Sequence, residues 1–341
     1  MFKQDIYISS PEIRTAERKM SNDDIFELVK KNYTGDKREL KNILQGIKMI
    51  FRYCDSNTRY FGTAENKKPL DYCIDPALSL MKKHNIFPQD IDLVVYGGIF
   101  REYFEPATAM EVAAKLGVQK VHAFDVTSAC SGFLQSTYVA ATLMQNDPTI
   151  NTALICAVDF PEVAIDYDIQ SFDELATKAA GLTLGSGGAA WFLQRKPFQN
   201  GGAKLLTARN VSLPQNYEIC QTPVFGKFRS QNRELFELGR KHVPALIREI
   251  TSDLGWKIED VDYFVSHQAG KKIITELVND LGVSMKKAPV THNLYGNTVN
   301  ITIPMTMDFL VKEGNVKKGN KIIMTTVAAG FTMVALAVEW S

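Results

Sequence analysis

Two stretches half a chain apart decide the fold: QDIDLVVYGG at residues 89–98 and EDVDYFVSHQ at residues 259–268. Each contains a short apolar run, which is typical of a buried strand. Aligning Asp92 with Asp262 gives an offset of 170 residues, and aligning Asn151 with Asn320 gives 169. Because two independent pairs agree, the sequence indicates an internal duplication.

The same order of elements recurs in each half. The first half continues with expected strands at 121–126, 151–160 and 189–194 and a helix at 130–146, whereas the second has a helix at 270–281, an apolar segment at 296–314 and strands at 320–331 and 332–340. Alternating strands and helices predict a layered α/β fold, in which each half has its own sheet and helices such as 130–146 lie between the two sheets. The alternative is two unrelated α/β domains, although no Pro/Gly/Ser-rich linker divides them.

Composition narrows the classes of function. The 341 residues are 45% hydrophobic and 23% charged, with a formal net charge of +1, so there is no domain-scale basic excess for binding nucleic acid. We expect a cytoplasmic protein, because the N-terminus lacks a signal-peptide apolar region and no 18-residue apolar run occurs. The five scattered cysteines form no CxxC pair, so we expect neither structural disulfides nor a metal site.

Cys130 is the candidate nucleophile. It lies in FDVTSACSGF (124–133), directly after an expected strand and at the start of a helix. A helix N-terminus carries partial positive charge and unpaired N–H groups, which predict a lowered thiol pKa and a place for an oxyanion. Taken alone, a cysteine among small residues is more often a packed core thiol than a nucleophile.

His267 and Asn297 are expected beside Cys130. His267 ends a strand in SHQAGKKI (266–273), and Asn297 lies in YGNTVNITIP (295–304) before an apolar helix, where it is alternatively a helix N-cap. The offset of about 170 places the turn of Cys130 opposite residue 300. The duplication therefore predicts that the Cys-bearing and Asn-bearing helix starts converge on one site.

These three segments, in this order, resemble the Cys-His-Asn triad of the thiolase superfamily, specifically the ketoacyl-acyl-carrier-protein (ACP) synthase III branch. The resemblance covers nearly the whole chain and extends to LTLGSGGAAWFL (182–193) and VAAGFTMVAL (327–336). It implies a thiolase fold of αβαβα layers, with an N-terminal half at 1–195 that carries the nucleophile and a C-terminal half at 196–341 that carries His and Asn.

The resemblance also implies the chemistry. Cys130 would be acylated by a thioester of CoA or phosphopantetheine, with no further cofactor, while His267 and Asn297 stabilise the enolate of the second substrate. The backbone N–H groups of Cys130 and Ala329 would hold the oxyanion on the Cys-bound acyl group. Ala328 and Ala329 stand where the family has glycines, a departure that keeps the backbone donors.

Glu105 is the second departure. REYFEPATA (101–109) puts a carboxylate directly before Pro106, where ordinary members of the branch carry an apolar residue. The segment resembles the subgroup that joins two acyl thioesters head to head, and related pyrone-forming ketosynthases, in which the glutamate reaches across a homodimer as a base. The alternatives are a solvated loop carboxylate or a partner for Arg101.

The remaining assignments rest on the resemblance alone. Arg59 resembles a position that meets the CoA nucleotide, or it is a structural salt bridge. Lys271 and Lys272 occupy the place where the family docks an acyl carrier protein, or they form a solvated helix face. The rival functions are decarboxylating condensation with malonyl-ACP, ester or amide formation, plant-type iterative extension, and a non-catalytic partner subunit.

Overall fold

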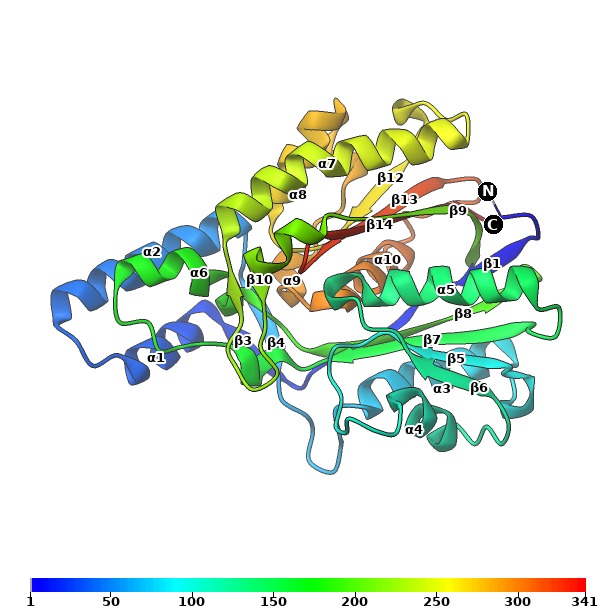
Figure 1. The fold of residues 1–341 in the computed structure, drawn as a ribbon, viewed down its shortest axis with the longest axis horizontal. Helices are drawn as coiled ribbons and strands as arrows, with labels where there is room; N and C mark the ends of the chain where they lie inside the picture. Colours follow the sequence, from blue (N-terminus) through cyan, green and yellow to red (C-terminus); the bar gives the residue numbers. More distant parts are fainter. Residues whose placement is uncertain (1) are drawn as a thin grey trace.

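The computed structural model describes residues 2–341 (Figure 1). The first half contains β1 (Ile6–Ser9), β2 (Glu12–Thr15), β3 (Arg18–Ser21), α1 (Asn22–Asn32), α2 (Lys37–Cys54), β4 (Thr58–Phe61), α3 (Asp71–His84), β5 (Leu93–Tyr96), α4 (Thr108–Lys115), β6 (His122–Asp125), α5 (Gly132–Asn146), β7 (Thr152–Asp159), α6 (Leu175–Lys178) and β8 (Gly187–Gln194). The second half contains β9 (Gly202–Ser212), β10 (Cys220–Gln221), β11 (Arg229–Ser230), α7 (Asn232–Asp253), β12 (Tyr263–Ser266), α8 (Lys271–Leu281), α9 (His292–Tyr295), α10 (Thr302–Lys312), β13 (Lys321–Ala328) and β14 (Thr332–Trp340).

The strands of the two halves join into one hydrogen-bonded path. The order is β12-β13-β14-β9-β1-β8-β7-β5-β6, with β2 also paired to β8, while β3–β4 and β10–β11 form separate hairpins. The expectation of a separate sheet for each half was wrong in this respect, because β1 pairs with β8 on one side and with β9 on the other. The short N-terminal strand β1, which is not part of the repeated set of elements, makes this connection.

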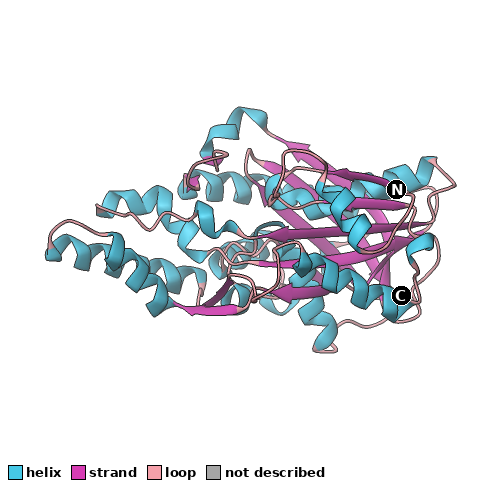
Figure 2. Ribbon diagram, turned by 90° about the horizontal axis from the view of Figure 1, so that it is seen from below, coloured by secondary structure: helices cyan, strands magenta, loops and turns pink. Residues whose placement is uncertain are grey.

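Three helical layers enclose the two half-sheets. Helix α5 contacts β5, β7 and β8 of the first half and β14 of the second, and α10 contacts β12, β13 and β8. Helices α3 and α4 cover the outer face of the first half-sheet, and α7 and α8 cover that of the second. Figure 2 shows helices on either side of the strands. The predicted αβαβα layering is confirmed.

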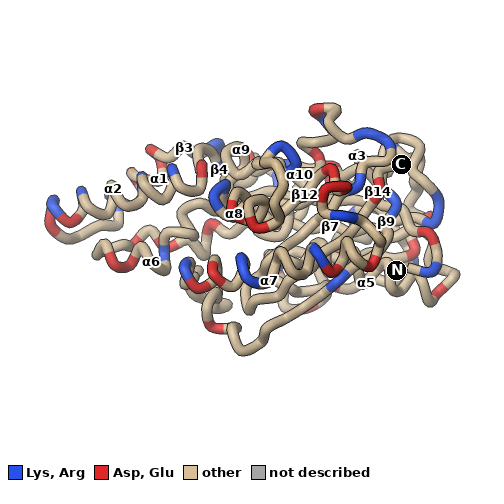
Figure 3. Tube along the Cα trace, turned by 90° about the horizontal axis from the view of Figure 1, so that it is seen from above, with Lys and Arg blue, Asp and Glu red and all other residues tan. Residues whose placement is uncertain are grey.

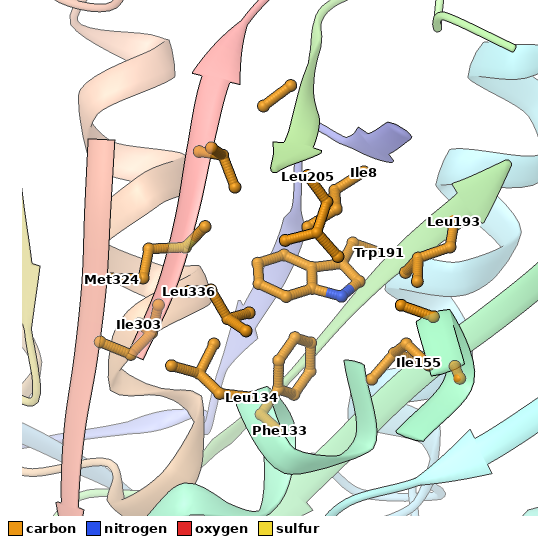
Figure 4. Packing of buried hydrophobic residues seen from close by; sticks show 14 of the residues in the cluster. Ile8, Phe133, Leu134, Ile155, Trp191, Leu193, Leu205, Ile303, Met324 and Leu336 are labelled. Carbon is orange, nitrogen blue, oxygen red and sulfur yellow. The ribbon is translucent and has the colours of Figure 1, made fainter. Parts of the chain in front are cut away.

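The central core explains why α5 lies inside. No residue from Gly132 to Gln145 is exposed, as expected for a helix covered on all sides. The Phe133 ring lies edge-on to Trp191 with centroids 4.7 Å apart, and the Trp191 indole N–H donates to Thr137 Oγ1 at 3.1 Å. Figure 4 shows this packing, in which Ile8, Leu205 and Leu336 lie around the indole. Truncating Phe133 would cost about 3–5 kcal/mol of stability.

The duplication offset appears in the elements themselves. Strands β5 and β12 begin 170 residues apart, as do helices α5 and α10 and the 3-10 turns η2 (Ala129–Ser131) and η9 (Val299–Ile301) that precede those helices. Strands β7 and β13 begin 169 apart. The repeat expected from the sequence therefore holds element by element, while the division at residue 195 stays a prediction.

Helices α1, α2 and α6 form a lobe that extends from the sheets (Figure 1). Its interior joins apolar residues of α1 and α2 to Ile165, Leu175 and Leu182, and Cys130 packs against this cluster. The segment at 174–181, which the sequence suggested as a wall of an acyl tunnel, lies here. Among residues 2–341, no helix is both long and apolar enough to cross a bilayer.

Candidate active site

Cys130 lies in a strained turn between β6 and α5. It is the middle residue of η2, and the preceding Ala129 has a φ of 42°, a conformation that costs an L-residue energy. The Ser131 hydroxyl accepts a hydrogen bond from Thr326 Oγ1 at 2.9 Å, which ties the turn to β13. A Cβ on Gly132 would lie 2.0 Å from the Gly97 carbonyl oxygen, so only glycine allows α5 to begin this close to β5.

The pKa of the Cys130 thiol is raised, not lowered. Desolvation is the largest cause, and Cys220 and Asp159 raise it further, whereas the backbone N–H groups of Ala329 and Cys130 oppose the rise. The sequence-based expectation of a lowered pKa was wrong, because packing against the lobe outweighs the local field of the helix start. The backbone N–H groups of Cys130 and Ala329 both lie at this thiol, and their role as oxyanion donors stays a prediction.

His267 follows the last residue of β12, and its backbone N–H donates to Thr325 O at 2.9 Å. The ring Nδ1 lies 2.8 Å from Thr302 Oγ1, and that hydroxyl is also 3.3 Å from Val299 O. Burial, with a smaller effect of His292, lowers the pKa of His267 to about 4, so the ring is neutral near pH 7. The Thr302 hydroxyl can either donate to Nδ1 or accept from it, so both neutral tautomers fit.

Asn297 is held through its backbone by the glycine-rich segment. Its N–H donates to Thr183 O at 2.8 Å, and its carbonyl accepts from Gly185 N–H at 2.9 Å. A Cβ on Gly185 would lie 2.3 Å from Tyr295 O, which explains the glycine. The Asn297 Oδ1 accepts from Val299 N–H at 3.0 Å, a local turn rather than the N-cap of α10. Within residues 2–341 its Nδ2 donates no hydrogen bond and remains available to a substrate.

The duplication brings these groups together as expected. The turns η2 and η9 contact each other, and Val299, at the offset of 170 from Ala129, also has a positive φ of 54°. Gly97 and His267 are likewise counterparts. A Cβ on Gly97 would lie 2.7 Å from Gly132 O, so the first half has no room for a side chain there. At the corresponding position of the second half, the His267 imidazole fits and forms a hydrogen bond with Thr302.

Glu105 does not reach this site within one chain. It lies in the stretch 101–106, in which every residue is exposed, and Arg101 donates to Thr127 Oγ1 at 2.6 Å rather than to Glu105. No ion pair of Glu105 occurs within residues 2–341. Its neighbours Tyr103 and Phe104 are 52% and 81% exposed, so an uncovered apolar surface surrounds the carboxylate.

Arg59 is a structural residue. Its side chain is fully buried, donates to Asn22 Oδ1 at 2.8 Å and Ser56 Oγ at 3.1 Å, and stacks on Phe51. Burial lowers its pKa to about 10. The expected contact with a CoA nucleotide is therefore contradicted, because the guanidinium faces no solvent, and its partners are neutral rather than a salt bridge.

Of the two lysines behind the His motif, Lys271 is exposed and Lys272 is half-buried. Lys271 pairs with Asp55 at 3.1 Å, and Lys272 pairs with Glu276 one turn along α8. Figure 3 shows basic and acidic positions interspersed along the trace around α8. Both the carrier-docking and the solvated-face interpretations fit this placement.

Three buried polar residues near the site were not predicted from the sequence. Asp159 ends the otherwise apolar strand β7, and Asn300 lies in η9; both are buried, and they bond each other. His292, fully buried behind His267, bonds the Gln268 carbonyl through Nδ1 at 2.8 Å. A carboxylate that closes a run of seven apolar or small residues was the one usable signal in the sequence.

Comparison with known proteins identifies the family. The model for 3-oxoacyl-[acyl-carrier-protein] synthase III matches residues 124–212, which include Cys130, and the model for its C-terminal part matches residues 252–340, which include His267 and Asn297. The synthase III of Campylobacter jejuni subsp. doylei is 30% identical over 272 residues, 79% of this chain and 82% of that protein. The chain belongs to the 3-oxoacyl-[acyl-carrier-protein] synthase III family.

Other members of the family and of its wider fold agree. The synthase III of Aquifex aeolicus is 28% identical over 264 residues, 77% of this chain and 82% of that protein. The crystal structure of Xanthomonas campestris OleA with bound lauric acid and lauroyl-CoA superposes with a TM-score of 0.89 at 21% identity over the full length of both chains. The predicted membership of the thiolase superfamily and its fold are confirmed.

Proposed function

We propose that this enzyme joins an acyl group on Cys130 to a second acyl or β-ketoacyl thioester by Claisen condensation, with Glu105 of the partner subunit as the base. The product is a β-keto acid or, from a β-ketoacyl substrate, an α-pyrone. The observation that carries the proposal is Glu105, an exposed carboxylate on an uncovered apolar loop, together with the site formed by Cys130, His267 and Asn297.

In the loading step the Cys130 sulfur attacks the thioester carbonyl, and the bond to the CoA or phosphopantetheine sulfur breaks. Because the thiol pKa is raised, its proton leaves during the attack. His267 Nε2 accepts it when the Thr302 hydroxyl points to Val299 O, and the proton then passes to the departing thiolate. The N–H groups of Cys130 and Ala329 hold the oxyanion.

In the condensation step the base removes a proton from Cα of the second thioester. Between the two steps His267 exchanges protons with solvent, gaining one on Nε2 and losing the one on Nδ1. The enolate oxygen is then held by His267 Nε2–H, with Thr302 donating to Nδ1, and by Asn297 Nδ2. The Cα atom attacks the acyl carbonyl, the bond to Cys130 Sγ breaks, and the thiolate recovers a proton from Glu105. Hydrolysis of the resulting β-ketoacyl thioester gives the acid. When the group on Cys130 is itself β-ketoacyl, the product is a 3,5-diketoacyl thioester, whose δ-enol oxygen attacks the thioester carbonyl, closes the six-membered pyrone ring and releases the thiol.

Two findings support this choice. The crystal structure of Xanthomonas campestris OleA holds lauric acid and lauroyl-CoA, which are long acyl ligands of the class we propose here. The apolar cluster of α1, α2 and 165–184 beside Cys130 is suited to an acyl chain. We further propose a cytoplasmic homodimer that takes acyl-CoA or carrier-bound substrates, the latter docking at Lys271 and Lys272.

Decarboxylating condensation with malonyl-ACP is the second candidate. The names of the curated relatives, β-ketoacyl-[acyl-carrier-protein] synthase III at 28–30% identity, favour it. It uses the same Cys, His and Asn but obtains its carbanion from loss of carbon dioxide. Release of carbon dioxide from malonyl thioester, with no need for Glu105, would select it, whereas an ester or amide product would indicate simple acyl transfer.

Subunit complementation tests the proposal. Glu105→Gln alone should still load Cys130 but lose condensation by at least ~10²-fold, and Cys130→Ala should lose both. A heterodimer of one Glu105→Gln chain and one Cys130→Ala chain is isolated with two affinity tags. In it the Glu105→Gln chain supplies Cys130, and the Cys130→Ala chain supplies Glu105. That single complete site should restore about half of wild-type condensation per dimer, because a two-fold dimer has two equivalent sites.

Two results would contradict the proposal. If the heterodimer stays inactive while wild-type dimers isolated with the same tags turn over, Glu105 does not act across the interface. If Glu105→Gln itself retains full condensation of two acyl-CoA molecules, the glutamate has no part in the reaction. Condensation is read as the mass of the new carbon–carbon product.

A further inference from the structure

Asp159 is a buried carboxylate without a cation. It ends β7, is 2% exposed, and pairs with no Lys, Arg or His within residues 2–341. Oδ1 accepts from Ile99 N–H at 3.0 Å, and Oδ2 accepts from Asn300 N–H at 3.2 Å and Asn300 Nδ2 at 2.6 Å. A buried anion that relies on amide donors alone is costly to folding, so its presence calls for a functional reason.

One set of donors belongs to the loop that carries Glu105. Ile99 begins that loop, and the Tyr96 hydroxyl donates to Phe100 O at 2.5 Å beside it. The far end of the loop is held by a different carboxylate, Asp125, which accepts from Thr108 N–H at 2.9 Å and from Ala109 N–H at 2.8 Å. Asp159 thus fixes where the loop leaves the sheet.

The other donors belong to the turn of Asn297. Asn300 is three residues along, fully buried, and at the duplication offset from Cys130 itself. Its Nδ2 is committed to Asp159, while its Oδ1 is buried without a partner within residues 2–341. The turn η9 packs against β7, so a shift of Asn300 would move the turn that carries Asn297.

We propose that Asp159 is a positioning residue for the condensation step, which, through Asn300, ties the Glu105 loop to the Asn297 turn. This inference rests on the proposed function. The carboxylate accepts from both sides at once, whereas a protonated acid places an O–H donor against the N–H groups on one of the two sides. Protonation would drive the Asn300 amide to rotate, so that its unpartnered Oδ1 accepts from the acid.

The carboxylate should therefore form within the working pH range. Burial raises the pKa of Asp159 to about 7, and the opposing N–H donors do not cancel that effect. The titratable groups that face it are Cys130 from η2 and Tyr96 from β5, while the loop and η9 present only amide groups. We expect condensation to rise with pH through this ionisation, and loading of Cys130 to gain nothing from it.

The experiment separates the two steps in the full-length protein. Cys130 is loaded from a medium-chain acyl-CoA and followed by intact mass, and the acyl-enzyme is then mixed with a second acyl-CoA or with malonyl-CoA for a single turnover between about pH 5.5 and 9. The variants are Asp159→Asn, Asn300→Ala and the matched control Asp125→Asn. Asp125→Asn loosens the same loop at its other end without touching Asn300.

We expect Asp159→Asn to load within about 3-fold of wild type, to condense at least ~10-fold more slowly, and to lose the pH dependence near neutrality. The Asn side chain keeps one acceptor for Ile99 and can donate to a rotated Asn300 amide, which preserves the fold. Asn300→Ala should also slow condensation and not loading. Asp125→Asn should lower condensation but keep the wild-type pH dependence.

The inference is overturned if Asp159→Asn keeps the wild-type rate or pH dependence, or if loading falls as much as condensation. Failure of the proposed function looks different. In that case the wild type condenses malonyl-CoA but never two acyl-CoA molecules, and the Asp159 comparison is decided on the malonyl reaction, where Asn297 and its turn still act.

Discussion

Replacing Asp159 by Asn should make folding less dependent on pH. The folded carboxyl holds its proton up to about pH 7, against an ordinary value of 3.8. Between these values the folded chain binds more protons than the unfolded chain, so the wild-type free energy of unfolding falls as pH rises through this window. At about 1.4 kcal/mol per pH unit, the fall amounts to about 3 kcal/mol between roughly pH 5 and pH 8.

The assay is urea unfolding of wild type and Asp159→Asn, followed by tryptophan fluorescence at matched protein concentration. Any pH-independent change in hydrogen bonding shifts the two proteins by a constant, and all other ionisations cancel in the difference. The variant should therefore gain about 3 kcal/mol relative to wild type on going from about pH 5 to pH 8. A difference that stays constant with pH would refute the argument that burial keeps Asp159 protonated.

Three further predictions concern the site, two of them with a matched control substitution. Thr302→Val removes the partner 2.8 Å from His267 Nδ1 and should slow condensation about 10-fold, with Thr302→Ser restoring it; equal rates for all three proteins would exclude the tautomer role. Lys272→Glu should raise KM for carrier-bound substrate about 10-fold and leave KM for acyl-CoA unchanged, and equal effects on both would remove the docking role. Gly185→Ala should lower the midpoint of urea unfolding, because its Cβ would lie 2.3 Å from Tyr295 O, whereas Gly239→Ala, with nothing within 4 Å, should not; the reverse order would contradict this packing.

The parts of the site that depend on local sequence were predictable. Cys130 and His267 each follow an expected strand, Asn297 precedes an apolar helix, and the repeat offset places the turns of Cys130 and Asn297 opposite each other without reference to packing. The strained conformations at Ala129 and Val299 recur at that same offset. Topology and duplication therefore determine which residues converge.

The parts that depend on burial were not predictable. A helix start favours a thiolate, but the lobe around Cys130 removes water from the thiol and reverses the direction of its pKa shift. Arg59 is enclosed by Asn22 and Ser56 and by α9, whose segment follows it by more than 200 residues. Since desolvation is set by distant segments of the chain, neither result follows from neighbouring residues.

The role of Glu105 could not be predicted from one chain either. The sequence shows an unusual carboxylate, and the structure shows it on an exposed loop held by Asp159 and Asp125 at its two ends. A single subunit contains no contact between this carboxylate and Cys130. The role proposed for Glu105 requires a second copy of the chain, which is why complementation between subunits is the appropriate test.

The central claim is that Cys130 carries the acyl group, and intact mass tests it most directly. After incubation with a medium-chain acyl-CoA, the wild-type protein should gain the mass of one acyl group, and Cys130→Ala should gain none. An adduct that persists in Cys130→Ala, or no adduct from any acyl-CoA or acyl carrier protein, would contradict the account.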